Sequence, residues 1–103
     1  MIKIFSYGTL YDKEVQMREF GQEFFIEPDL DYVSGWDLIK VKMDGDKYFV
    51  AIESCKNCII MGAIVHIPEE LMCEVDEYET KAYKRINITT LCGNECQMYV
   101  KRD

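Results

Sequence analysis

Residues 36–52 read WDLIKVKMDGDKYFVAI, two runs rich in β-branched and aromatic residues on either side of Asp44-Gly45. An Asp-Gly pair between such runs is a strong signal for a hairpin with a two-residue turn, because both positions accept positive φ. The sequence therefore predicts antiparallel strands over 36–43 and 47–52.

Further strands are predicted on both sides of this hairpin. Short apolar runs bounded by turn residues favour strands. These runs cover residues 2–7, 24–33, 59–67, 85–91 and 97–101.

Two short helices complete the prediction. Asp12 can cap a helix that runs to about Phe20 and is ended by Gly21. Pro68 is expected at the first position of a second helix, followed by acids that suit its positive end, and this helix runs to about Glu79.

Length and composition limit the possible architectures. A chain of 103 residues has room for one core, and 49% hydrophobic with 30% charged residues is typical of a globular protein. We therefore expect a single α+β domain over residues 1–103, a mostly antiparallel mixed β-barrel with two short helices.

The charge and the apolar pattern exclude several classes of partner. The net charge is −7, and 12 basic residues are scattered among 19 acids, which argues against a nucleic-acid partner. No apolar run is long enough to span a membrane, and the start lacks a signal-peptide pattern, so no membrane partner is expected and the expected location is the cytoplasm. The oligomeric state stays open.

Glu79 interrupts the pattern of the second helix. At about 100° per residue, the apolar face consists of Leu71, Met72, Val75 and Tyr78. The direction of Glu79 falls within this core-facing arc. Either the helix ends before it and the side chain turns out to water, or the carboxylate lines a pocket where desolvation raises its pKa.

Two motifs carry a family resemblance. The run Phe5-Ser6-Tyr7-Gly8-Thr9-Leu10 resembles the strand-to-loop YG(S/T)L signature of the γ-glutamylcyclotransferase-like superfamily, which includes γ-glutamylamine cyclotransferases. The run Val75-Asp76-Glu77-Tyr78-Glu79, followed by Tyr83-Lys84-Arg85, is similar to its LDxYE…YxR segment. The resemblance spans nearly the whole chain, and residues 22–60 match it only in character.

The resemblance implies a reaction and a set of site residues. The expected substrate is a γ-glutamyl amine or amino acid, which cyclises to 5-oxoproline and releases its amine, with Glu79 as general acid and base. No cofactor is expected. The substrate-binding residues implied by the family are Tyr7, Gly8, Thr9, Leu10, Tyr83 and Tyr99. The motif positions Asp76, Tyr78, Tyr83 and Arg85 are expected to shape the site.

The chemistry of ring closure asks for the same kinds of group. Intramolecular attack has a large proximity advantage, so the enzyme mainly fixes the conformation and moves protons. A glutamate with a raised pKa can take a proton and return it. Backbone N–H groups around Gly8 can stabilise the developing oxyanion, since glycine allows close approach. Gly8 is alternatively explained as the residue of a tight turn.

Two other functions remain open. A non-catalytic domain of the same fold could bind a small molecule. The five cysteines also permit a zinc-binding module with four thiolate ligands, Cys55, Cys58, Cys92 and Cys96, although these spacings suit ordinary thiols equally well. A catalytic dithiol is disfavoured, because Cys55 does not follow a strand into a helix. Cys73 is expected to pack within the second helix.

Overall fold

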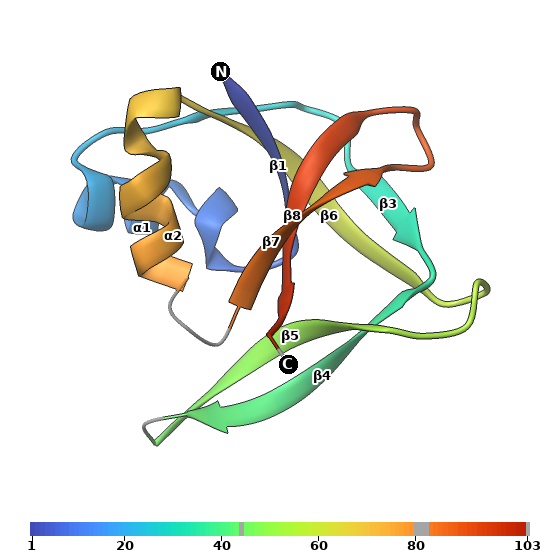
Figure 1. Ribbon diagram of the computed structural model, residues 1–103. Coiled ribbons are helices and arrows are strands. Elements are labelled where there is room, and N and C mark those ends of the chain that lie inside the picture. Colours follow the sequence, from blue (N-terminus) through green and yellow to red (C-terminus); the bar gives the residue numbers. More distant parts are fainter. Residues whose placement is uncertain (44, 80–82, 103) are drawn as a thin grey trace.

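The computed structural model describes residues 1–43, 45–79 and 83–102 and shows helices packed against a twisted sheet (Figure 1). The strands are β1 (Ile2–Ser6), β2 (Phe25–Ile26), β3 (Asp31–Ser34), β4 (Trp36–Met43), β5 (Asp46–Glu53), β6 (Ile59–Ile67), β7 (Tyr83–Thr89) and β8 (Glu95–Lys101). The helices are α1 (Lys13–Phe20), α2 (Met72–Glu79) and two short 3₁₀ turns, η1 (Thr9–Tyr11) and η2 (Glu69–Leu71). The predicted α+β class with two short helices is confirmed.

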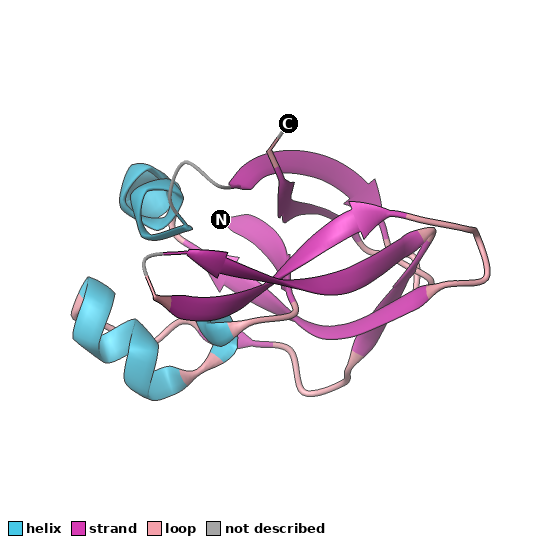
Figure 2. Cartoon of the chain, turned by 90° about the horizontal axis from the view of Figure 1, so that it is seen from below, coloured by secondary structure: helices cyan, strands magenta, loops and turns pink. Residues whose placement is uncertain are grey.

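Most strand pairs are antiparallel. The main sheet has the order β2-β6-β1-β8-β7, and β3 pairs with another part of β6. Only β1 and β8 run parallel in the described pairings, with Ile4 opposite Gln97. Both α-helices lie at the same end of the molecule (Figure 2).

The β4–β5 hairpin forms as predicted, with Trp36 opposite Glu53 and Lys42 opposite Lys47. Gly45 in the turn has a φ of 86°, which glycine adopts at little cost. Asp44 lies outside the described residues.

The hairpin is joined to the main sheet by side chains. Among the described residues, no backbone ladder connects the hairpin with the main sheet. The backbone N–H of Ala51 instead donates to the hydroxyl of Tyr7, and the hydroxyl of Tyr83 donates to the carbonyl of Phe49.

Two predicted elements differ in detail. The single strand expected over 24–33 is divided into β2 and β3, because Pro28 between them has no N–H to donate to a ladder. Pro68 is not the first helical residue: its ψ of 137° is extended, and it precedes η2, so α2 begins only at Met72.

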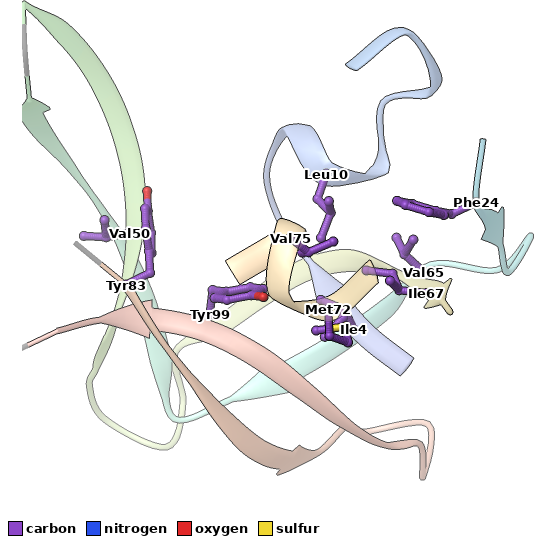
Figure 3. Close-up of a cluster of buried hydrophobic side chains, with 10 residues drawn as sticks. All are labelled: Ile4, Leu10, Phe24, Val50, Val65, Ile67, Met72, Val75, Tyr83 and Tyr99. Carbon is purple, nitrogen blue, oxygen red and sulfur yellow. The ribbon is translucent and has the colours of Figure 1, made fainter. Parts of the chain in front are cut away.

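Both faces of the central strands are buried. One cluster lies between the sheet and the helices and includes Ile4, Val65 and Val75 (Figure 3). The second cluster, with Phe5 and Ile64, packs against Trp36 and Leu38 of the hairpin. Burial on both faces explains why β6 is a nearly continuous apolar run.

Gln16 ties α1 to the segments on either side of it. It is fully buried, its Nε2 donates to the carbonyl of Leu10 at 2.8 Å, and its Oε1 accepts from the N–H of Phe24 at 2.7 Å. A Gln16→Leu variant is expected to lose about 2 kcal/mol of unfolding free energy, because buried backbone groups lose their partner. Urea denaturation measures this loss. The exposed Gln22→Leu variant is the matched control, and equal stability of the two variants would contradict the role of Gln16.

Candidate active site

A pocket of about 560 Å³ opens where β1 ends and the chain turns into η1. It is enclosed by elements distant in sequence: the loop after β1, the side of α1, the start of β5, the end of α2, and strands β7 and β8. Its lining residues are Ile4, Phe5, Ser6, Tyr7, Gly8, Thr9, Leu10, Val15, Arg18, Glu19, Lys47, Tyr48, Phe49, Tyr78, Glu79, Tyr83 and Tyr99. The structure therefore brings together all seven residues that the sequence marked for catalysis and substrate binding.

Glu79 is the last residue of α2 and is partly buried in the pocket wall. Val75, one turn earlier, is fully buried, so the face that carries both residues points inward. Burial, and secondarily the negative charge of Asp76, raises the pKa of Glu79 to about 7. Within the described ranges 1–43, 45–79 and 83–102, no group donates a hydrogen bond to this carboxylate.

Four tyrosines surround Glu79. Burial raises the pKa of all four, and the charge of Glu79 contributes in each case: they are Tyr7, Tyr78, Tyr83 and Tyr99. The pKa of Tyr83 reaches about 12. These phenols therefore stay neutral at physiological pH and act as hydrogen-bonding groups around the carboxylate.

Two of these tyrosines connect the pocket wall to backbone groups of β5 and β8. Tyr7 donates to the carbonyl of Tyr99 at 2.5 Å and accepts from the N–H of Ala51 at 3.2 Å. The hydroxyl of Tyr83 points toward β5 beside Val50 (Figure 3). The pocket is thus built into the contact between the main sheet and the hairpin.

The other two tyrosines fix α2. The Tyr99 hydroxyl points toward α2 (Figure 3), donates to Asp76, and so orients the turn that carries Glu79. Arg85 lies 3.4 Å from the same carboxylate of Asp76. Tyr78 shares a hydrogen bond with Thr9 of the loop. These contacts give the motif residues Asp76, Tyr78 and Arg85 structural partners around the site.

The backbone conformation at position 8 does not require a glycine. Its φ is −129°, and a Cβ built on it would meet no atom within 4 Å. Its N–H donates to the hydroxyl of Ser6 at 3.4 Å. A tight turn that only glycine can make is therefore the wrong explanation for Gly8, whose Cβ position is open space in the pocket wall.

Sequence reasoning missed several residues of the pocket. The returning strand of the hairpin contributes Lys47, Tyr48 and Phe49, and the exposed side of α1 contributes Arg18 and Glu19. Their local sequence gives no sign of this role, because hairpin and helix reach the pocket only through tertiary packing.

The structure gives no support to the alternative of a zinc module formed by Cys55, Cys58, Cys92 and Cys96. Across the described residues, no three His, Cys, Asp or Glu side chains are grouped to hold a metal ion. Cys96 is buried, and its Sγ lies 3.9 Å from the carbonyl of Asn94. The expected packing of Cys73 is wrong: the residue is exposed, because it lies outside the apolar arc of α2.

The sequence from residue 4 to residue 103 matches the family model described as "Gamma-glutamyl cyclotransferase, AIG2-like". No curated protein sequence matches this chain. No helix in the described part of the chain is long and apolar enough to cross a membrane.

Solved structures are similar in fold at low sequence identity. One Arabidopsis thaliana protein studied in solution has a TM-score of 0.80 at 15% identity, over 99% of this chain and 69% of its own. Another from Arabidopsis thaliana has a TM-score of 0.78 at 16% identity, over 97% and 61%. A protein named gamma-glutamyl cyclotransferase has a TM-score of 0.74 at 16% identity, over 99% and 67%. This chain thus spans about three fifths to two thirds of the length of these proteins.

Proposed function

This chain belongs to the gamma-glutamyl cyclotransferase, AIG2-like family, and we propose that it catalyses cyclisation of a γ-glutamyl compound in the pocket beside Glu79. The family expected from the two sequence motifs is thereby confirmed.

The proposed reaction needs one proton carrier. Glu79 takes a proton from the α-ammonium group of the γ-glutamyl substrate, and the freed nitrogen attacks the γ-carbonyl carbon. Glu79 then returns this proton to the leaving nitrogen as the bond from that carbon to the leaving nitrogen breaks. The second proton, which the attacking nitrogen loses when it becomes the lactam nitrogen, also ends on the released amine, which leaves as an ammonium ion. The products are 5-oxoproline and a free amine, and no external reactant is consumed.

One observation carries the proposal: Glu79 is a partly buried, pocket-lining carboxylate with a pKa of about 7. At neutral pH such a group is present in both protonation states, as an acid–base catalyst requires. Glu79 also lies in the same pocket wall as the loop from Tyr7 to Leu10, where a substrate would contact both. The tyrosines around it hold the pocket walls together through their own hydrogen bonds and, being neutral, do not compete for the proton.

The test is release of 5-oxoproline from a panel of γ-glutamyl amino acids and γ-glutamyl amines. The Glu79→Gln variant removes the proton carrier, and Glu77→Gln on the exposed side of the same helix is the matched control. We expect release by the wild type and by the control, and not by Glu79→Gln. Binding of panel members by a folded protein without any release would instead support the non-catalytic function.

The Gly8→Ala variant tests the role of the loop in substrate binding independently of the stability of the fold. The unfolding free energy is expected to change by less than about 0.5 kcal/mol, because the new methyl group meets no neighbour. The same methyl group takes up space at the pocket wall and shifts a bound substrate, so kcat/KM is expected to fall roughly 10- to 100-fold. Steady-state kinetics and thermal denaturation of the same preparation measure both. Unchanged kinetics would remove the loop from the substrate site.

A further inference from the structure

The connection between β5 and β6 carries two cysteines in contact. The Sγ atoms of Cys55 and Cys58 lie 3.1 Å apart, and the hydroxyl of Ser54 lies 3.3 Å from the sulfur of Cys58. Cys55 is exposed and Cys58 is partly exposed. The two thiols are therefore next to each other and accessible to solvent.

Backbone hydrogen bonds hold this turn in place. The N–H of Cys58 donates to the carbonyl of Cys55 at 2.9 Å, which closes a four-residue turn. Gly35 accepts from the N–H of Ser54 and donates to the carbonyl of Cys58, both at 2.9 Å. The contact between the sulfurs is thus supported by the start of the hairpin and not by the side chains alone.

The turn lies away from the proposed active site. In Figures 1 and 2 it forms the loop on the right, on the side of the molecule opposite the helices. Neither cysteine lines the pocket. A chemical change here is separable from the chemistry of Glu79.

The environment of this pair differs from that of Cys92 and Cys96, at the connection between β7 and β8. The hydrogen bond with Cys58 lowers the pKa of Cys55, which favours the reactive thiolate. Burial raises the pKa of Cys96 to about 11, and the neighbouring Asp31 raises the pKa of Cys92. Reactivity is therefore expected to concentrate at Cys55.

We propose that Cys55 and Cys58 form a reversible intramolecular disulfide by exchange with small disulfides of the glutathione type. The Cys55 thiolate attacks one sulfur of the external disulfide, and a mixed disulfide forms as one small thiolate leaves. The Cys58 thiolate then attacks the sulfur of Cys55, and the second small thiolate leaves. The protein loses two protons and two electrons, and the external disulfide is reduced to two thiols.

The structure requires little movement for this step. A disulfide has a sulfur–sulfur distance of about 2.05 Å, so the observed 3.1 Å must shorten by about 1 Å. Both side chains reach solvent, so rotation about their χ1 bonds can supply this movement.

The experiment equilibrates the reduced full chain with mixtures of reduced and oxidised glutathione. Acid quenching, unfolding and alkylation then count free thiols by mass. The chain has five cysteines, so the expected count falls from five to three, with the two unlabelled residues in the peptide that contains Cys55 and Cys58. Half-oxidation is reached at a certain ratio of oxidised glutathione to the square of reduced glutathione. This ratio is expected to be roughly tenfold lower for the folded chain than for the chain in urea, because the fold already holds the sulfurs together.

Two variants make the result specific. Cys55→Ser is expected to keep four free thiols under all mixtures, and Cys73→Ser, which removes an exposed cysteine from α2, is expected to lose two of its four. Five free thiols in the oxidised wild type, loss at other cysteines, or equal oxidation of the folded and urea-unfolded chains would overturn the proposal. Because the readout is a thiol count, failure of this proposal leaves the proposed cyclotransferase function intact.

Discussion

The rate of 5-oxoproline release is expected to rise with pH through about 7, and Glu79→Gln is expected to lower that rate at least about 100-fold. Glu79 acts first as a base, so the active enzyme carries it deprotonated, and its fraction grows as the pH passes the pKa of about 7. The residual rate of the variant is expected to lack this rise. A pH profile of kcat/KM for both proteins measures the effect, because kcat/KM reports the pKa values of the free enzyme.

The same carboxyl group makes the stability of the fold depend on pH. Its pKa is 4.5 in the unfolded chain and about 7 in the folded one, so the folded protein binds more protons between these values. Its contribution to stability is therefore complete below pH 4.5 and is lost as the pH rises through 7. As the pH rises from 4.5 to above 7, the unfolding free energy of the wild type is expected to fall by on the order of 2 kcal/mol relative to that of Glu79→Gln.

Denaturation of both proteins at pH 4.5 and pH 8 isolates this contribution, because every other titrating group is shared. Glu77→Gln, exposed on the same helix, is expected to follow the wild type at both values. Full activity of Glu79→Gln would show that Glu79 is not the proton carrier. The same pH dependence of stability in the variant and the wild type would show that Glu79 is not desolvated in the folded protein.

Gly62→Ala is expected to destabilise the fold by about 3 kcal/mol, which lowers the melting temperature by roughly 15 °C. A Cβ at this position in β6 would lie 2.4 Å from the carbonyl oxygen of Ser6 and 2.8 Å from the Cζ atom of Phe5. The first of these is a backbone atom in the ladder of β1, so it cannot move aside cheaply. The strand that leads into the pocket loop must shift instead.

Thermal and urea denaturation measure this loss, and Gly8→Ala provides the comparison. Both substitutions add one methyl group to a glycine, but only the one at position 62 meets neighbouring atoms. We therefore expect a large loss of stability in Gly62→Ala and almost none in Gly8→Ala. Equal melting temperatures would show that β1 and β6 are not packed as closely as the structure has them.

The sequence by itself determined the local elements and the family. The Asp-Gly hairpin, the capped helix α1 and the apolar run of β6 depend on backbone preference and on the spacing of apolar residues, which are properties of short segments. The family prediction rested on two short motifs. These motifs marked the loop from Tyr7 to Leu10, and they agreed with the helical periodicity in marking Glu79.

Only the tertiary structure decided which segments meet. Glutamine side chains are mostly exposed in proteins, yet Gln16 is fully buried because two backbone groups from outside α1 bond to its amide. Phe49 reaches the pocket because two tyrosine hydroxyls join the hairpin to the main sheet near it. The pKa of Glu79 depends on burial by elements far away in the chain, and desolvation is a property of the packed surroundings and not of the residue's sequence neighbours. The periodicity of the sequence could therefore predict that Glu79 faces the core. Its pKa, in contrast, depends on the packing of α2 against the pocket loop, β7 and β8.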